Sequence, residues 1–553
     1  MPGGAPDRVD VVVIGAGAAG MAAAALCAAE GLSVVLIEKT ASVGGTTATS
    51  GGMVWAPEDI AAARAYLDQV IGQGIGAEDP GGRRESFLAH AAAAIAALAA
   101  RTELRFQPVA RYPDYYPDLP GATLGGRVFE PVPFDGRALG RHFARLRPPI
   151  PEFTPFGGMM IGRGDLAHFR GITRSPRSAL VVARRLAAYA GQRLAWPRGT
   201  TLVLGNALAG RLLLSLLRLG VDLRLETSAT KLIFAEGRVQ GVVAGGKTLS
   251  VRRGVVLASG GFSHDPALRA AFLPAPAQRF SAAFAGDSGD GIRLARAVGA
   301  ALARRGVDAA FWTPVSTFTR DDASTAIFPH TVTDRGKPGS LVVDEHGRRF
   351  VNEALSYHEF VRAMLRAGLA RAFLICDHAF LRRYGLGPIA PVFPRPRRWV
   401  RRGYLTASPD IAGLARALGL APAALAATLA RFNADAARGE DGDFGRGNDA
   451  YQRHLGDPDR RPNPCLAPLA TPPFYAITLY PADLGTSAGL ATDAAARVLD
   501  DAGTPIAGLY ACGNDMASVM DGAYPGPGIT LGPALTFAYL VARALCESEV
   551  RKE

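Results

Sequence analysis

The sequence predicts an α/β protein in which a Rossmann-type domain carries an inserted α+β domain. The chain opens with an apolar β-branched strand, a glycine-rich turn, an alanine-rich helix and a second apolar strand, a βαβ unit over residues 9–39. Near Phe311 the chain changes to shorter elements with more loops. Strands with glycine-rich turns return within residues 450–553, which end in an apolar helix over 529–545. We therefore expect the insertion to occupy residues 311–449.

The overall composition limits the class of protein. With 553 residues, of which 48% are hydrophobic and 20% charged, the chain can bury a large core, so disordered and collagen-like classes are excluded. Lys and Arg outnumber Asp and Glu by 61 to 49, a formal net charge of +12. Only five of these cations are lysines, and no run of mixed Lys and Arg with interleaved aromatic residues occurs, so we expect no nucleic-acid partner.

The cysteines, the N-terminal residues and the lengths of the apolar runs predict the cellular compartment of the protein. The five cysteines are scattered without a CxxC pair, so we expect neither a disulfide framework nor a metal site, and a reducing compartment fits. The first ten residues carry acids where a secretory signal would be basic and then apolar. No apolar run reaches the length of about 18 residues that a membrane span needs. The expectation is a cytoplasmic protein.

The turn after the first strand has the spacing of a dinucleotide-binding site. Gly15, Gly17 and Gly20 form GxGxxG, and Glu38 ends the second strand. Gly15 allows a tight turn, Gly17 lets the backbone approach a pyrophosphate, and Gly20 packs the helix on the strand. Glu38 can accept hydrogen bonds from a ribose. The alternative is a glycine-rich turn in an ordinary βαβ unit.

Small and hydroxylated residues follow Glu38 in the segment KTASVGGTTATSGG, where backbone amides can face a ligand. The segment resembles flavoproteins of the glutathione-reductase-like and fumarate-reductase-like types, which implies FAD. Gly-Gly after the strand at 253–262, GDSGDG at 286–291 and GLYACGN at 508–514 add further contacts. The predicted FAD contacts beyond the four residues above are Ala19, Lys39, Gly44, Gly45, Thr46, Thr47, Ser50, Gly51, Gly52, Gly260, Asp290, Gly513, Asn514, Gly528 and Leu531. No His or Cys stands in a recognised attachment segment, so FAD is expected to be non-covalent.

These motifs divide the chain into a Rossmann-type FAD-binding domain and an inserted catalytic domain. Residues 1–310 and 450–553 are assigned to the FAD-binding domain, and residues 311–449 to the α+β catalytic domain that caps the substrate. Strands are expected within 221–233 and 238–244, and a strand pair is expected around LVVDEHGRRFVNE. The substrate is expected to bind between the two domains, against the flavin.

Three positions argue against a dicarboxylate substrate. Fumarate reductases and succinate dehydrogenases resemble this chain in segment order, but their F-V-N-E-x-x-x-R arginine is replaced here by Tyr357. Their second arginine is missing from DGAYPGPGITLGP, which has Tyr524, and their HT-x-GG histidine is missing from GTSAG at 485–489. Two buried carboxylates without cationic partners would be costly. We therefore expect a different substrate.

The chain resembles the 3-ketosteroid Δ1-dehydrogenase (3-oxosteroid 1-dehydrogenase) family in three segments. These are PDYY at 113–116, NEALSYHEF at 352–360 and YPGPG at 524–528, in the family's order and together with the N-terminal motifs. The resemblance covers nearly the whole chain. It implies catalytic roles for Tyr115, Tyr357, Tyr524 and the backbone amide of Gly528. Ser487 and Ala488 in GTSAG depart from the family's GTKGG.

The reaction implied by this resemblance is FAD-dependent 1,2-dehydrogenation of 3-keto-4-ene steroids, with a quinone or a similar carrier as electron acceptor. Tyr524 and the Gly528 amide would stabilise the enolate, Tyr357 would take the C2 proton with support from Tyr115, and flavin N5 would accept the C1 hydride. An ordinary tyrosine has a pKa of about 10, so activity should rise at alkaline pH. The alternatives are a 3-ketosteroid 4(5α)-dehydrogenase, a fumarate-reductase-like ene-reductase, or a basic binding protein with a structural flavin. Any single tyrosine could also be a core residue with a satisfied hydroxyl.

One arginine-rich segment stands apart. Residues 163–198 contain eight arginines and one aspartate, and much of the segment is expected to be helical. It is longer than the corresponding region of shorter family members. One interpretation is contact with the inner face of the cell membrane, through which very apolar substrates such as cholest-4-en-3-one would enter. The alternative is a solvated helix on the outside of the FAD domain.

Overall fold

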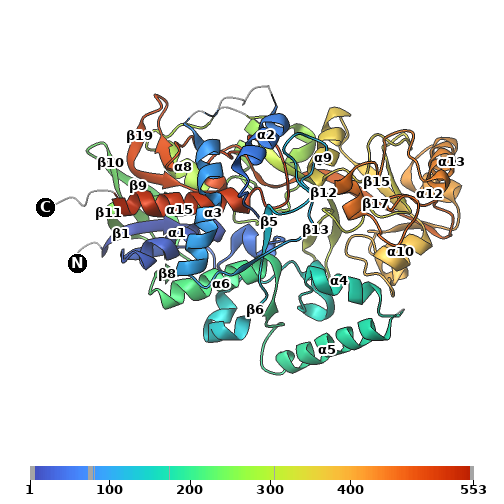
Figure 1. Cartoon of the computed structure of the whole chain (residues 1–553), viewed down its shortest axis with the longest axis horizontal. Helices are drawn as coiled ribbons and strands as arrows, with labels where there is room; N and C mark the ends of the chain where they lie inside the picture. Colours follow the sequence, from blue (N-terminus) through green and yellow to red (C-terminus); the bar gives the residue numbers. More distant parts are fainter. Residues whose placement is uncertain (1–6, 73–78, 80, 174, 304–305, 548–553) are drawn as a thin grey trace.

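The computed structural model describes residues 7–72, 79, 81–173, 175–303 and 306–547. Figure 1 shows two regions along the long axis of the molecule, one around a large sheet that contains β1, and one around β15 and β17. Parts of two segments considered in the sequence analysis lie outside the described residues, namely the N-terminal residues 1–6 and Arg174 of the arginine-rich segment, as do the C-terminal residues 548–553.

The first region is built on an eight-stranded sheet with a parallel centre. The parallel strands run in the order β8, β2, β1, β11, β19, because β1 pairs with β2 and β11, β2 with β8, and β11 with β19. Their bounds are β1 (Asp7–Ile14), β2 (Val34–Ile37), β8 (Asp222–Arg224), β11 (Lys247–Leu257) and β19 (Pro505–Ala511). All four residues of β2 are buried, as expected for a parallel sheet covered on both faces. The α/β prediction is confirmed.

Antiparallel strands extend this sheet. β9 (Ala229–Ala235) and β10 (Arg238–Ala244) form a hairpin beside the first half of β11, and β18 (Arg497–Leu499) pairs with β19. Smaller sheets lie nearby: β3 (Val54–Trp55), β4 (Phe106–Pro108) and β5 (Val128–Pro131) form one, and β6 (Phe134–Asp135) and β7 (Thr201–Leu202) form another.

Helix α1 (Ala18–Ala29) follows β1 directly and is buried from Ala18 to Cys27. Its small alanine side chains let it pack closely on α15 (Leu531–Glu547) and α6 (Leu204–Arg218), and α15 also packs on α3 (Arg83–Arg101). The C-terminal helix therefore returns to the first βαβ unit, which Figure 1 shows as α15 beside α1. The other helices of this region are α2 (Ile60–Ile71), α7 (Pro266–Phe272) and α8 (Asp290–Arg296).

The second region is a six-stranded antiparallel sheet flanked by helices. Its order is β13, β12, β17, β15, β14, with β16 paired to β17. The strands are β12 (Ala310–Thr319), β13 (Thr325–Pro329), β14 (Ser340–Val343), β15 (Ala372–Cys376), β16 (Thr406–Ser408) and β17 (Phe474–Thr486). The helices are α9 (Tyr357–Arg366), α10 (His378–Tyr384), α11 (Pro396–Arg401), α12 (Ile411–Leu418), α13 (Pro422–Arg438) and α14 (Ala450–Leu455).

The strand pairing differs from the predicted division after residue 449. We assigned residues 450–553 to the FAD-binding domain, but β17 pairs with β12 and β15 of the second sheet. The chain therefore returns to the first sheet only after Thr486. Strand partners over such separations are set by tertiary packing, so the local pattern did not reveal this. The prediction of a strand pair around LVVDEHGRRFVNE is also wrong, because β14 pairs with β15. A turn follows β14, and it is closed by a 2.9 Å hydrogen bond from the Asp344 N–H to the Arg348 carbonyl.

The arginine-rich segment forms two helices at the lower edge of the molecule in Figure 1, α4 (Arg163–Arg170) and α5 (Pro176–Arg193). Ser175 caps α5 by accepting a hydrogen bond from the Ser178 N–H. Most of α5 is exposed, and only Ser178 and Val182 are buried. Among the described residues, no helix combines the length and the apolar character that a membrane crossing requires.

Candidate active site

The turn between β1 and α1 has the geometry that its glycines predict. Gly15 has φ +105°, and a Cβ there would lie 2.3 Å from the carbonyl oxygen of Ala258, the residue that follows β11. A Cβ on Gly20 would lie 1.9 Å from the Gly15 oxygen, so α1 can approach β1 only with glycine. A Cβ on Gly17 would meet no atom within 4 Å. The space above Gly17 is open, as an approaching pyrophosphate requires.

Glu38 is held at the end of β2 beside this turn. Its carboxylate accepts hydrogen bonds from the Ala16 N–H at 3.0 Å and from the Thr40 N–H at 3.0 Å and hydroxyl at 2.9 Å. These bonds fix the carboxylate next to the glycine turn and leave it only half-buried. An ionised carboxylate in this position can accept hydroxyl donors of a ribose.

The small-residue segment packs on the N-terminus of α1. Thr47 accepts the Ala18 N–H at 3.1 Å, and the Gly44 N–H donates to the Ala16 carbonyl at 2.7 Å. Gly52, with φ +68°, lies so close to α6 that a Cβ would be 2.5 Å from the Gly205 nitrogen. The predicted residues Gly45, Thr46, Ser50 and Gly51 belong to the same segment, whose middle part is the 3-10 turn η1 (Gly45–Thr49).

Residues 286–291 add polar side chains beside the small-residue segment. Lys39 donates to Ser288 at 2.5 Å and pairs with Asp290, so two predicted contacts bond to each other. Thr46 donates to Asp287 at 2.7 Å, and burial raises the pKa of this carboxyl well above its usual range. A Cβ on Gly260 would lie 2.5 Å from the Asp287 carboxylate. The predicted residues of three separate segments therefore meet here.

The end of β19 completes this side of the site. Gly513 has φ +66°, and a Cβ there would be 3.0 Å from the Ala19 side chain. The Asn514 amide nitrogen lies 2.7 Å from where a Gly485 Cβ would stand, which brings GTSAG against this turn. Ser487 and Ala488 donate their backbone N–H groups to the Ala309 carbonyl at 2.9 and 3.0 Å. The departure from GTKGG therefore lies where the two regions join.

The cradle fits FAD. The space over Gly17 admits a pyrophosphate, and the Glu38 carboxylate and the backbone amides of the small-residue segment can supply the acceptor and donors that a dinucleotide needs. Leu531 begins α15, whose N-terminal amides add a positive end at the same edge.

Three predicted tyrosines meet between the two regions. The Tyr115 hydroxyl donates to the Tyr357 hydroxyl at 3.1 Å. The Tyr524 ring stacks on Tyr115, with centroids 5.5 Å apart and planes at 10°, and its centroid lies 5.1 Å from that of Tyr357. Tyr357 is the first residue of α9, which Ser356 caps by accepting the Glu359 N–H. The tyrosines therefore come from a loop of the first region, a helix of the second and the loop before α15.

Burial sets the protonation of this cluster. Desolvation raises the pKa of Tyr115 and the pKa of Tyr357 well above 10. It raises the pKa of Tyr524 only to about 12, because hydrogen bonding with Tyr357 opposes the shift. All three phenols are therefore neutral at pH 7.

Gly528 has a backbone that only glycine can adopt here. Its φ is +92°, and a Cβ would lie 2.7 Å from the Met53 carbonyl carbon and from the Trp55 nitrogen. Its carbonyl accepts the Trp55 N–H at 3.1 Å and the Gly532 N–H at 2.8 Å. Among the described residues, its own N–H donates to no partner. The amide is free for a ligand near Tyr524.

A buried network joins the loops of Tyr115 and Tyr524. The Tyr115 N–H and the Tyr66 hydroxyl both donate to the Pro525 carbonyl, at 2.9 and 2.6 Å. Asp114 accepts Trp55 Nε1 at 3.0 Å and pairs with Arg127 at 2.7 Å. Because these groups are buried and mutually satisfied, the two loops are held rigidly together.

Sequence reasoning missed several residues of the cluster. Tyr451 packs on Tyr115 with centroids 4.5 Å apart, and its buried hydroxyl has no hydrogen-bond partner among the described residues. Phe311 meets the Tyr524 ring edge-on at 5.5 Å, and the His358 ring lies 5.6 Å from it. Only His358 carried a signal, since it follows Tyr357 directly in NEALSYHEF. Arg147, which lies 3.4 Å from the Phe284 ring centroid and donates to Thr40, was also missed at the cofactor side.

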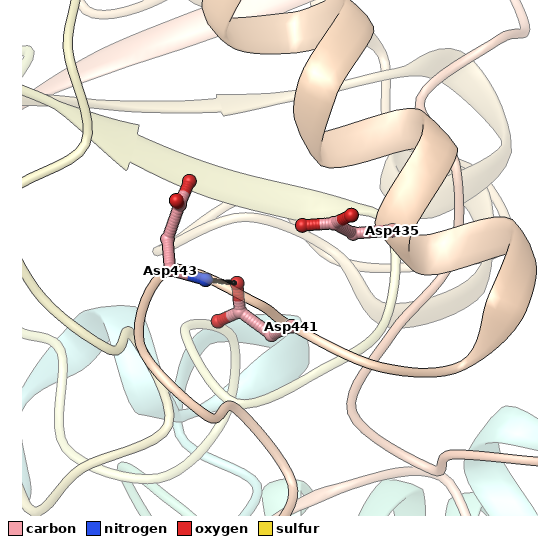
Figure 2. Close-up of side chains that lie close together, drawn as sticks. All are labelled: Asp435, Asp441 and Asp443. Carbon is pink, nitrogen blue, oxygen red and sulfur yellow. Dashed lines mark hydrogen bonds between the residues drawn. The ribbon is translucent and has the colours of Figure 1, made fainter.

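Figure 2 shows a group of three aspartates whose carboxylate oxygens lie close enough to hold a cation: Asp435, Asp441 and Asp443. Each already pairs with an arginine, namely Arg438, Arg349 and Arg431 respectively. Three guanidinium groups compensate the three carboxylates, so this turn is held together by ion pairs and we assign no ligand to it.

The fold and the cradle define an FAD-dependent flavoprotein. A family model described as "FAD binding domain" matches residues 10–531, and the chain belongs to that family.

The relatives are more specific. The chain is 37% identical to a 3-oxosteroid 1-dehydrogenase of Mycobacterium tuberculosis over 97% of this chain and 98% of the relative. A 3-ketosteroid Δ1-dehydrogenase from Sterolibacterium denitrificans, solved with 1,4-androstadiene-3,17-dione, superposes with a TM-score of 0.90 at 38% identity, over 98% of this chain and 100% of that one. A 4-oxocyclohex-2-ene-1-carboxylate 5-dehydrogenase of Sinomonas cyclohexanicum is 36% identical over 97% of this chain and 93% of the relative. This chain belongs to the 3-oxosteroid 1-dehydrogenase family.

Proposed function

We propose that this chain is an FAD-dependent dehydrogenase that removes the C1 and C2 hydrogens of 3-keto-4-ene steroids. The observation that carries the proposal is the 3.1 Å contact between the hydroxyls of Tyr115 and Tyr357, beside Tyr524 and a Gly528 amide that no described residue accepts. Such a set suits enolisation of a ketone, and the family's relatives act on 3-oxosteroids.

Each tyrosine has a distinct task in this proposal. The Tyr524 hydroxyl and the Gly528 N–H donate to the C3 carbonyl oxygen and stabilise the negative charge that develops on it. Tyr357, as phenolate, takes the C2 proton, and the Tyr115 hydroxyl donates to Tyr357 and stabilises that phenolate. FAD, when bound, supplies the acceptor for the C1 hydride.

The test is anaerobic mixing of the flavin-loaded protein with androst-4-ene-3,17-dione, followed by flavin absorbance and by product mass and NMR. We expect flavin bleaching and loss of two hydrogens at C1 and C2. The same mixing with a saturated 3-ketosteroid and with an ene-acid separates the alternative flavoenzymes. Bleaching only by the saturated ketosteroid, with loss of hydrogens at C4 and C5, would identify a 4(5α)-dehydrogenase. Reoxidation of previously reduced flavin by the ene-acid, with no bleaching by either steroid, would identify an ene-reductase.

A second candidate substrate class is a cyclohexanone that carries a carboxylate. Arg163 favours it: its guanidinium lies 4.9 Å from the Tyr112 ring and contacts Met53, next to Gly528. The described residues place no carboxylate against Arg163. Arg163 also lines a cavity of about 230 Å³ beneath α4 and α5. The Sinomonas relative is named for a 4-oxocyclohexene carboxylate, so that acid belongs in the same mixing experiment.

We further propose that residues 163–198 contact the inner face of the cell membrane. The outward face of α5 exposes Leu180, 53% accessible, and Leu194, 91% accessible, lies just beyond its end. Exposed Arg177 and Arg184 flank these apolar side chains and suit anionic headgroups. A quinone in the same membrane would be a suitable electron acceptor.

Co-sedimentation with anionic and with zwitterionic vesicles tests this contact. We expect binding to anionic vesicles that is lost in a Leu180→Asp/Leu194→Asp double variant. The matched control is Phe234→Asp, an exposed apolar residue on β9 of the first sheet. Equal binding by all three proteins would show that α5 is a solvated helix.

A further inference from the structure

The first turn of α9 presents three consecutive side chains to three other segments of the site. Tyr357 meets the Tyr115 hydroxyl at 3.1 Å. Glu359 accepts the hydroxyl of Tyr116 at 2.8 Å, which ties α9 to the neighbour of Tyr115. His358 turns toward the start of β12 and toward Tyr524. One helical turn therefore gathers the loops that carry the other two tyrosines.

The hydrogen bonds of His358 define its tautomer. Its Nδ1 accepts the backbone N–H of Trp312 at 3.1 Å, so Nδ1 is unprotonated and Nε2 carries the hydrogen. Nε2 faces the Asp308 carboxylate oxygen Oδ2 at 3.5 Å. His358 is completely buried, and its ring lies 5.6 Å from the Tyr524 ring at 42°. The contacts of His358 are with Trp312, Asp308 and the Tyr524 ring, so its place in the fold is that of a group that packs and orients its neighbours.

Asp308 contacts β12, α9 and the loop before Tyr524. Its Oδ1 accepts Trp312 Nε1 at 2.8 Å, and its Oδ2 lies 3.1 Å from Arg362 Nε of α9. A Cβ on Gly522 would lie 2.0 Å from the Asp308 carbonyl oxygen, so the Asp308 backbone rests directly on the loop two residues before Tyr524. The Val307 N–H reinforces that contact by donating to the Asp521 carbonyl at 2.6 Å.

The Tyr524 ring is consequently enclosed on several sides. Tyr115 stacks on it, Phe311 and Tyr357 meet it edge-on, and the His358 ring tilts against it. His358 is the member of this enclosure that also bonds to β12 and faces Asp308. Its loss would both open a space beside Tyr524 and release α9, with Tyr357, from the start of β12.

We propose that His358, which accepts the Trp312 N–H and faces the Asp308 carboxylate, is a positioning residue that sets the Tyr524 hydroxyl relative to Tyr357. The inference rests on the proposed function, because it concerns the two groups assigned to removal of the C2 proton. Misalignment of these groups slows abstraction of the C2 proton, whereas transfer of the C1 hydrogen depends on the substrate's distance from the flavin.

The test compares His358→Asn with wild type in the flavin-loaded full chain. Asn keeps an acceptor for the Trp312 N–H but lacks the ring against Tyr524 and the N–H toward Asp308. We expect kcat with androst-4-ene-3,17-dione to fall about 10- to 100-fold with KM within about twofold. The kinetic isotope effect with 2-deuterated substrate should rise, and that with 1-deuterated substrate should fall toward one.

Asp308→Asn provides a second variant and should lower kcat with the same change in isotope effects. His378→Asn is the matched control, because His378 also bonds a tyrosine hydroxyl, that of Tyr475 at 3.1 Å, but lies on α10 outside the site. It should leave kcat and both isotope effects unchanged. His358→Gln, which keeps a donor toward Asp308, replaces His358→Asn if that variant does not bind FAD.

The outcomes separate the inference from the function on which it rests. If wild type oxidises the steroid and the His358 variant has the wild-type isotope effects, the positioning role is wrong and the function stands. If kcat falls while both isotope effects stay constant, the loss is a general structural one and the inference is again overturned. If wild type oxidises no ketone, both are wrong.

Discussion

The cofactor cradle and the tyrosine cluster are built in different ways. The cradle is made mainly of backbone: Gly15, Gly17 and Gly20 provide a close turn, an open approach and a packing contact within six residues. The cluster is made of side chains, and Tyr115 and Tyr357, whose hydroxyls touch, are separated by 242 positions in the chain. The first depends on local backbone conformation and the second on how two regions pack. Each can therefore be broken without the other.

The largest expected effect breaks the cluster and leaves the cradle intact. Tyr357→Phe removes the proposed base, and loss of a general base typically costs about 10³-fold in rate. We expect that fall in kcat with unchanged FAD content and melting temperature, measured by steady-state oxidation and flavin absorbance. Tyr475→Phe, which removes a tyrosine hydroxyl that bonds His378, is the control and should keep its activity. A Tyr357→Phe variant with more than a tenth of wild-type kcat would contradict the assignment.

The pH dependence of kcat tests the tyrosine cluster further. Burial raises the pKa of Tyr357 well above 10, so the phenolate is a minor species at pH 7, and its fraction grows about tenfold per pH unit. We expect kcat to rise about 100-fold from pH 7 to 9 without a plateau. Above about pH 10 the unfolded chain ionises its tyrosines while the buried ones stay neutral, so folding stability falls there and limits the range. A flat profile between pH 7 and 9 would rule out Tyr357 as the base.

A paired substitution breaks the cradle in two distinguishable ways. A Cβ on Gly17 has no atom of the described residues within 4 Å, so Gly17→Val should leave the stability of the FAD-free protein unchanged while weakening FAD binding about tenfold or more. A Cβ on Gly20 collides with the Gly15 oxygen, so Gly20→Ala should lower the melting temperature itself. Calorimetry of FAD-free protein and titration with FAD separate the two. Equal stability losses would mean that Gly17 is a packing glycine.

The smallest expected effect concerns Arg163, at the start of segment 163–198, where it contacts Met53 and Tyr112. Arg163→Gln should lower kcat/KM for 4-oxocyclohex-2-ene-1-carboxylate about tenfold, the value of one charge-assisted hydrogen bond, and leave that for androst-4-ene-3,17-dione unchanged. Arg185→Gln is the control, because Arg185 lines the same cavity but pairs with Asp165. Unchanged selectivity between the two ketones would remove the second candidate substrate class.

The sequence predicted the parts of the site better than the borders of its regions. The positions of Gly15, Gly17, Gly20 and Glu38 in the turn could be predicted, because they follow from local turn geometry and strand order. The boundary after residue 449 was misplaced, because β17 joins the second sheet through partners more than 90 residues away. Tyr451 belongs to no recognisable motif, and only packing brings it against Tyr115.

By itself the sequence determined an α/β flavoprotein of a ketone-dehydrogenating family, because short spacings in glycine turns and tyrosine segments encode a backbone path and a set of reactive groups. Tertiary structure decided which hydroxyls touch, which amide has no partner in the described part of the chain and which histidine borders the clustered tyrosines. The Tyr115–Tyr357 contact and the approach of His358 to Asp308 join segments that are distant in the chain, and none of the described residues accepts the Gly528 N–H. Their geometry arises from the packing of the second region on the first, which no local pattern contains.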